Sequence, residues 1–160
     1  MTLSTVSALL CAVMALTAAA GESRFYRSSS CPCGWTEYRD RCFLYVSEIM
    51  SWPMAEKNCE SMRANLASVR SFDEYLAIQR LTAWNGYKNT WIGGSDAQQE
   101  RLWFWIDGTP FTYGSWCSGQ PDNQFGKQHC LQMNFGSKKC WDDVTCNVRL
   151  PSVCAKKILG

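Results

Sequence analysis

The chain contains 160 residues, 46% of which are hydrophobic, and it carries a formal net charge of +2. This length suits one domain with a leader. So small a net charge argues against a nucleic-acid partner and against a membrane-surface role, because both usually require dense positive charge.

The first residues have the features of a secretory signal. Residues 8–16 are mostly apolar, and residues 18–20 are alanines that provide a small-residue cleavage site. We therefore predict a signal peptide over 1–20 and a secreted, extracellular protein. The apolar run is too short to span a bilayer comfortably, so no membrane insertion is expected. Residues 21–30 are polar and serine-rich and are predicted to form a short flexible arm.

Two helices are predicted after an opening hairpin over residues 31–45. Ser51 is a candidate N-cap for the first helix, and a proline in the first turn supports this start. Its apolar residues recur at helical spacing, namely Trp52, Ala55, Cys59 and Met62. Ser71 and Glu74 form a capping box, which predicts a second helix that continues to about Leu81.

The second half of the chain predicts short strands around one long loop. Strand-like runs cover residues 90–94, 102–105, 130–135 and 152–155, and a further strand begins at 139–141. Residues 109–128 are rich in Gly, Ser, Pro and Asn and predict a loop. Early helices followed by short strands indicate an α+β domain. Four tryptophans in or next to these strands are predicted to form the core: Trp91, Trp103, Trp105 and Trp141.

The cysteines predict a disulfide framework. Ten are present, and Cys11 falls within the predicted leader, which leaves nine. In an exported chain such a set favours disulfides, and the absence of paired C-x-x-C clusters argues against a zinc ribbon. The odd number predicts that one cysteine bonds outside this set.

Several motifs, in order along the chain, together resemble a C-type lectin domain. They are Cys31-Pro32-x-Gly34-Trp35 with Cys42, Asn65-Leu66-Ala67-Ser68, Trp91-Ile92-Gly93-Gly94, Gln120-Pro121-Asp122, Trp141-Asp142-Asp143 and Cys154. The resemblance covers residues 31–157. It implies a disulfide-stapled domain with two helices, small antiparallel sheets and a long loop region.

The resemblance also implies how the cysteines pair. The implied bonds are Cys31–Cys42, Cys59–Cys154, Cys130–Cys146 and an extra Cys117–Cys140 bridge, similar to one in fish lectins and fish type II antifreeze proteins. Cys33 is then the candidate for a bond between two chains, which predicts a disulfide-linked homodimer. Two alternatives stay open: a small thiol that caps Cys33, or Cys33 in place of Cys31 as the partner of Cys42.

One calcium ion is implied by the same resemblance. Its ligands would be Gln120, Asp122, Gln128, Asp142 and Asp143. Two of these depart from the family pattern, since Gln128 replaces a Glu and Asp142 replaces an Asn. The set keeps three carboxylates and two amide oxygens, and calcium accepts both kinds of ligand.

The resemblance further implies the sugar class. Gln120-Pro121-Asp122 is similar to the galactose-type triplet, and a cis peptide before Pro121 would aim both flanking side chains at the metal. Sugar hydroxyls would bridge an acid and an amide in two pairs, Gln120 with Asp122 and Gln128 with Asp142. Phe125 would stack on the apolar face of galactose, although it equally suits packing within the loop.

The predicted function is therefore a secreted binding module for galactose-type glycans on cell or microbial surfaces, and not an enzyme. His129 is the only histidine, and no nucleophile and orienting acid accompany it in the sequence. Two alternatives stay open: a type II antifreeze protein, or a lectin-like protein that binds no sugar. The antifreeze pattern has a fifth internal bridge, and Asp96 stands near where one of its cysteines would fall.

Overall fold

A computed structural model describes residues 31–158. The predicted signal peptide and flexible arm lie outside these residues. The described part contains two α-helices, α2 (Trp52–Ser61) and α3 (Phe72–Leu81), and two short 3-10 turns, η2 (Ala83–Asn85) and η3 (Gln124–Gly126). Its strands are β1 (Thr36–Tyr38), β2 (Arg41–Met50), β3 (Asn65–Leu66), β4 (Thr90–Ser95), β5 (Phe104–Trp105), β6 (Cys130–Phe135), β7 (Cys140–Val144) and β8 (Leu150–Lys157).

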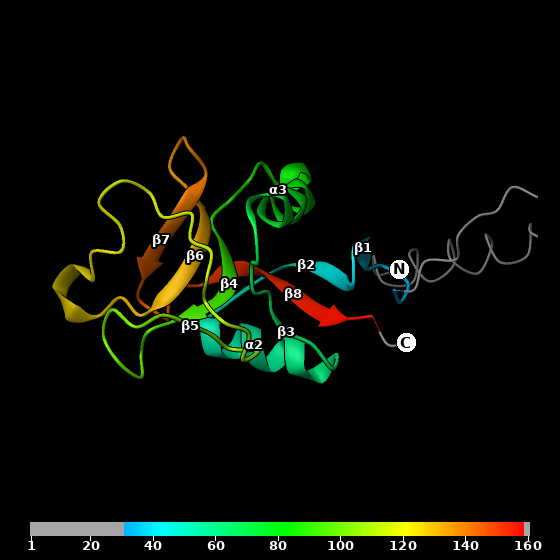
Figure 1. Cartoon of the computed structure of the whole chain (residues 1–160), viewed down its shortest axis with the longest axis horizontal. Helices are drawn as coiled ribbons and strands as arrows, with labels where there is room; N and C mark the ends of the chain where they lie inside the picture. Colours follow the sequence, from blue (N-terminus) through cyan, green and yellow to red (C-terminus); the bar gives the residue numbers. More distant parts are fainter. Residues whose placement is uncertain (1–30, 159–160) are drawn as a thin grey trace, which may run out of the picture.

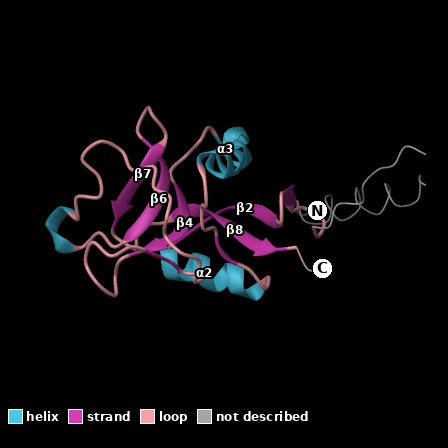
Figure 2. Cartoon of the chain, in the orientation of Figure 1, coloured by secondary structure: helices cyan, strands magenta, loops and turns pink. Residues whose placement is uncertain are grey.

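The strands join into one mixed sheet in the order β1-β2-β8-β4-β6-β7, with β3 paired to β8 and β5 paired to β4. This confirms the predicted α+β class, with the difference that the strand pairs are connected rather than separate. The link is the parallel pairing of β4 with β8, where Trp91 lies opposite Ser152. The later, yellow part of the long loop 106–129, which includes η3, projects from the end of the molecule opposite to β1, as Figures 1 and 2 show.

Helix α2 begins at Trp52 as predicted and lies against β3, β4 and β8. Its buried side includes Trp52, whose indole Nε1 donates a hydrogen bond to the Ile92 carbonyl at 2.9 Å. Ser51 is the N-cap by position, but its side chain makes no capping hydrogen bond. Tertiary packing therefore fixes the start of this helix more than the cap does. Met62 lies one residue beyond the helix, at its C-cap.

Helix α3 starts at the predicted capping box, but only half of the box forms. Ser71 Oγ accepts from the Glu74 backbone nitrogen at 3.2 Å. The Glu74 carboxylate instead accepts from the Arg70 backbone at 2.6 Å and from buried Arg41 at 3.0 Å. Arg41 also donates to the Ser68 carbonyl at 3.0 Å, so this ion pair ties β2 to the segment before α3.

The predicted tryptophan core is confirmed. The side chains are at most 9% exposed: Trp91 0%, Trp103 9%, Trp105 3% and Trp141 0%. Trp141 is central, because Tyr75 of α3 and Trp105 of β5 both meet its ring edge-on, at centroid distances of 5.6 and 5.7 Å. Edge-to-face contacts of this kind add to the burial of apolar area. The core therefore holds β7 in a fixed position relative to α3.

Close approach explains why β4 carries two glycines. A Cβ at Gly93 would lie 2.5 Å from the Leu66 carbonyl oxygen, and one at Gly94 would lie 2.6 Å from a Leu131 methyl carbon. A side chain at either position would push β4 away from β3 or β6.

The structure contains the four implied disulfides, Cys31–Cys42, Cys59–Cys154, Cys117–Cys140 and Cys130–Cys146. Cys59–Cys154 joins α2 to β8 across 95 residues. Closing so long a loop stabilises the fold by about 4–5 kcal/mol in the chain-entropy model. Cys33 is also disulfide-bonded. The interchain bond stays a prediction.

Within 31–158, no helix is long and apolar enough to cross a membrane.

Candidate functional site

The candidate ligands lie on strand β7, which pairs with β6, and on the long loop beside it. The two strands are antiparallel, with Leu131 opposite Asp143 and Gln132 opposite Asp142. The loop is attached beside them, because the Cys117 backbone nitrogen donates to the Trp141 carbonyl at 2.9 Å. The strands thus supply two buried acids, and the loop supplies the other candidate ligands.

Asp143 is the anchor of the loop. It is only 1% exposed. Its Oδ1 accepts from the Asp122 backbone nitrogen at 3.0 Å, and its Oδ2 accepts from the Asn123 backbone nitrogen at 2.8 Å. Burial raises the pKa of the Asp143 carboxyl above its usual value, although the two backbone hydrogen bonds act in the opposite direction. One strand residue therefore sets the position of the candidate binding loop.

Asp142 is held from the side by the neighbouring strand. It is 6% exposed, and its Oδ2 accepts from Gln132 Nε2 at 2.6 Å. Burial raises the pKa of this carboxyl, the bond from Gln132 lowers it, and the charges of Asp143 and Asp122 raise it further. The mutual repulsion shows that the three carboxylates share one region of negative potential.

The loop residues are linked to one another by short-range bonds. The Gln120–Pro121 peptide is cis, as predicted. Gln120 Oε1 accepts from the Asp122 backbone at 3.1 Å, and Gln128 Oε1 accepts from the Gln124 backbone at 2.6 Å. Backbone nitrogens of the loop thus connect four of the candidate side chains, Gln120, Asp122, Gln128 and Asp143, whereas Asp142 bonds to Gln132.

The donor set fits a calcium ion. All five side chains offer oxygen, which is the ligand atom that this hard cation prefers. Among the described residues, none of the three carboxylates forms an ion pair with Lys or Arg. Buried charges are normally paired or bound to metal, and a divalent cation would offset the burial and the neighbouring negative charges that raise the pKa of the Asp142 carboxyl. The residues that would hold it are Gln120, Asp122, Gln128, Asp142 and Asp143.

Phe125 lies at the outer edge of the same loop. Its side chain is 87% exposed, and its backbone adopts a left-handed conformation with φ of 60° within η3. An aromatic ring this exposed contributes little to packing within the loop.

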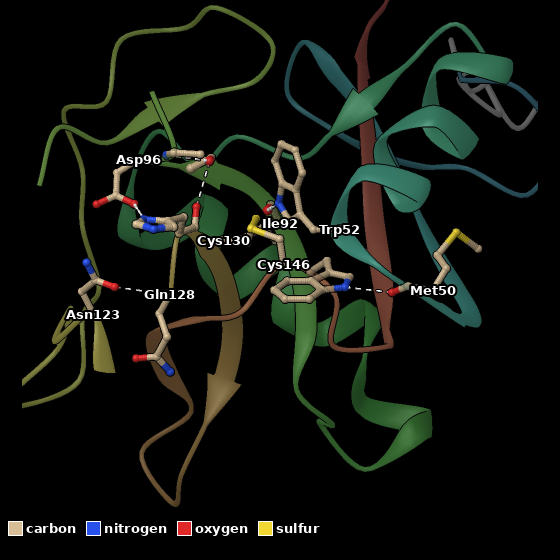
Figure 3. Close-up of a disulfide and its surroundings, with 12 residues drawn as sticks. Met50, Trp52, Ile92, Asp96, Asn123, Gln128, Cys130 and Cys146 are labelled. Atoms are coloured by element: carbon tan, nitrogen blue, oxygen red, sulfur yellow. Dashed lines mark hydrogen bonds and ion pairs between the residues drawn. A yellow bond between two sulfur atoms is a disulfide. The ribbon is translucent and has the colours of Figure 1, made fainter. Parts of the chain in front are cut away.

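A second cluster of metal-ligating groups was missed by sequence reasoning. Asp96, Glu100 and His129 offer ligand atoms that all lie within 4.8 Å of one another. Figure 3 labels Asp96 close to Asn123 and Gln128, and the Gln128 backbone donates to Asn123 Oδ1 at 2.9 Å. Asp96 and His129 lie close together because Ser95 of β4 lies opposite Cys130 of β6. That pairing is not visible in the sequence.

Comparison with known proteins gives a consistent result. Residues 48–156 match the family model described as the lectin C-type domain. Ladderlectin from Oncorhynchus mykiss is 38% identical over 95% of this chain and 92% of its own length. The galactose-specific lectin nattectin from Thalassophryne nattereri is 40% identical over 82% of this chain and 83% of its own length. The structure of herring type II antifreeze protein superposes with a TM-score of 0.77 and 39% identity, over 81% of this chain and all (100%) of that chain.

Proposed function

Because the chain belongs to the C-type lectin domain family, we propose that it is a secreted lectin that binds galactose-type glycans through one calcium ion. The observation that supports this proposal is that buried Asp143 of β7 holds the loop that carries Gln120, Asp122 and Gln128, by accepting hydrogen bonds from the Asp122 and Asn123 backbone nitrogens. The role is binding, not catalysis.

The oxygen set supplies both halves of sugar recognition. A calcium ion would accept two neighbouring hydroxyl oxygens of the sugar as ligands. Each hydroxyl then needs one acceptor and one donor, and each carboxylate–amide pair supplies both. Gln120 with Asp122 makes one such pair and Gln128 with Asp142 the other. Where the family has Glu and Asn, this chain has Gln128 and Asp142. The carboxylate and the amide therefore change places, but the pair still offers one hydrogen-bond acceptor and one donor.

Two further features support the sugar class and the location. The triplet Gln120-Pro121-Asp122 is the galactose-type version of the family motif, and nattectin carries galactose specificity in its name. The exposed ring of Phe125 offers the apolar surface on which the face of a galactose ring stacks. The four disulfides require an oxidising compartment, which supports secretion and glycans on cell or microbial surfaces as targets.

Affinity chromatography tests the proposal directly. The protein should be retained on galactose resin in millimolar calcium and released by chelator, with mannose resin as the specificity control. Asp122→Asn should lose retention, whereas the matched variant Asp73→Asn on α3 should keep it. Retention that does not depend on calcium would contradict the metal part, and absence of retention in calcium would contradict the sugar part.

Ice binding is the second candidate function, because the herring antifreeze protein shares 39% identity and the whole fold. It requires no sugar site. Ice-crystal shaping by the protein, together with failure to bind galactose resin, would favour this function. Failure in both assays would favour the third possibility, a lectin-like protein that binds a protein partner.

A further inference from the structure

We propose that a positively charged cavity beside the C-terminal end of β8 binds the sulfate or phosphate ester group of an acidic sugar. The cavity has a volume of about 490 Å³ and is lined by the turn after α2, the end of β8 and residues 107–110 of the long loop. Five cationic side chains contribute to the lining: Arg41, Arg63, Arg70, Lys156 and Lys157. Among the described lining residues, Asp107 is the only one with a carboxylate.

Strand pairing explains why these cations gather. Arg41 of β2 lies directly opposite Lys157 of β8. The short strand β3, which begins two residues after Arg63, pairs with β8 through Asn65 and Ala155. Residues opposite each other in an antiparallel pair share one face of the sheet, and like charges at such positions destabilise the pair. An anion bound beside them would remove this repulsion.

Two of the five cations are already offset by acids that hold them in place. Arg41 Nη1 lies 3.0 Å from Glu74 Oε1, and its Nη2 lies 3.8 Å from Asp107 Oδ2. Arg70 Nη2 lies 2.7 Å from Asp40 Oδ1. Burial lowers the pKa of the Arg41 guanidinium, the carboxylate of Glu74 raises it, and the charge of Arg70 lowers it again. The positive groups of the lining therefore repel one another in spite of these acids.

The other three cations have no acid within ion-pairing distance in the part of the chain that the structure describes. Lys156 Nζ lies 4.1 Å from the centroid of the Trp35 ring and donates to the Met62 carbonyl at 3.2 Å, so its position is fixed. Arg63 and Lys157 are exposed to solvent. A cleft lined by charges of one sign focuses the electric field and concentrates ions of the opposite sign. The cavity is therefore suited to an anionic ligand.

The remaining lining residues favour an acidic sugar over other anions. Guanidinium and ammonium groups bind oxyanions through charge-assisted hydrogen bonds. Asn65 and Thr109 add an amide and a hydroxyl for sugar hydroxyls, and the apolar lining residues are small: Ala64, Pro110 and Ala155. The volume lies within the range of about 300–1,000 Å³ that is usual for small-molecule sites. A single cavity, in contrast to a long basic stripe, does not suit nucleic acid.

This cavity is separate from the proposed calcium site. Strand β8 ends near β1, at the opposite end of the molecule from η3, as Figure 1 shows. None of the five candidate calcium ligands, all of them described, lines the cavity. The inference therefore does not rest on the proposed galactose site, and it gives the chain a second sugar site of different chemistry.

Titration with galactose 6-sulfate and with galactose 6-phosphate tests the proposal, with calorimetry for affinity and amide NMR for location. Chelator is present throughout, so calcium is absent, and neutral galactose controls for the ester group. We expect one ester ligand per chain, shifts of the Arg63 and Lys157 amide resonances, and weaker binding as the salt concentration rises. The ester with the lower Kd identifies the source as a sulfated or a phosphorylated glycan.

Matched variants test the assignment of the cations. Arg63→Gln and Lys157→Gln each remove one exposed cation and should each raise the Kd about fivefold, with a larger rise in the double variant. Arg80→Gln and Lys138→Gln remove exposed cations outside the cavity and should bind as the wild type does. Thermal melts of all variants identify any that fail to fold.

Three results would overturn the site: no binding of either ester by the wild type, equal affinity for neutral galactose in chelator, or wild-type affinity in the folded double variant. Equal affinity for inorganic sulfate would overturn the sugar part of the proposal. Retention on galactose resin in calcium is measured in parallel, so failure of this cavity and failure of the proposed lectin function are told apart.

Discussion

Asp143 Oδ1 lies 3.0 Å from the backbone nitrogen of Asp122, so a buried strand residue directly holds the last residue of the candidate binding triplet. The same carboxylate also holds the next amide along the loop. Strand β7 is itself fixed by the tryptophan core. The geometry of the loop is thus set by the rigid part of the domain, which is how binding loops on stable scaffolds keep their shape.

Calcium should raise the melting temperature of the wild type, and Asp143→Asn should abolish this rise. A ligand that binds only the folded state stabilises it, by about 2.7 kcal/mol at one hundred times its Kd. The variant loses a charge that calcium needs and an acceptor that holds the loop. Thermal melts in millimolar calcium and in chelator measure both effects, with Asp73→Asn as control. An unchanged calcium response in Asp143→Asn would contradict the assigned ligand set.

Gln128→Glu should tighten calcium binding. The change adds a fourth carboxylate to a set of three, and calcium affinity in proteins rises with the number of charged ligands. We expect about a tenfold lower Kd, which corresponds to about 1.4 kcal/mol. Calorimetric titration measures it, and Gln124→Glu, a nearby exposed position, controls for added charge alone. An equal gain from Gln124→Glu would mean that Gln128 is not a ligand.

The double substitution Gln120→Glu with Asp122→Asn should move sugar preference from galactose towards mannose. It exchanges the acceptor and donor positions within one carboxylate–amide pair and leaves the net charge unchanged. Glycan arrays of wild type and variant in calcium provide the comparison. Identical array profiles for the two proteins would show that this triplet does not choose the sugar.

Arg41→Met should destabilise the fold by up to about 3–5 kcal/mol, because buried Glu74 loses one of its two charged partners and keeps only Arg70, while the Ser68 carbonyl loses a donor. Arg41 and Glu74 side chains are 5% and 3% exposed, so water cannot replace the lost interaction. Urea unfolding with disulfides intact measures the change. The double variant Arg41→Met/Glu74→Gln should recover part of the loss. A single variant within 1 kcal/mol of the wild type, roughly the size of a surface effect, would contradict this account.

Asp40 should make stability fall in acid. A hydrogen bond from Arg70 lowers the pKa of the Asp40 carboxyl from 3.8 to about 2. Because the folded-state pKa is the lower one, the contribution is present above the unfolded value and is lost as the pH falls to about 2. NMR titration of the Asp40 carboxyl should show this midpoint, and Arg70→Gln should move it upwards. An unchanged midpoint in the variant would show that Arg70 is not the cause.

The sequence alone indicated the helices and most strands, and its motifs suggested the residues of the proposed calcium site. These follow from local signals: helical spacing from Trp52 onwards, the Ser71 cap, alternation in β6, and an ordered set of motifs. The motif order also implied the four disulfide pairs that the structure contains. Such signals are carried by neighbouring residues and need no knowledge of the rest of the fold.

Only the tertiary structure decided what depends on distant segments meeting. The parallel pairing of β4 with β8 joins the strands into one sheet, and no local pattern encodes it. Glu74 bonds to Arg70 and Arg41 rather than completing its capping box, because burial beside a charged partner outweighs a local bond. The grouping of Asp96 with His129 likewise exists only because β4 and β6 pair, since side-chain chemistry at a site depends on proximity in space and not on proximity in sequence.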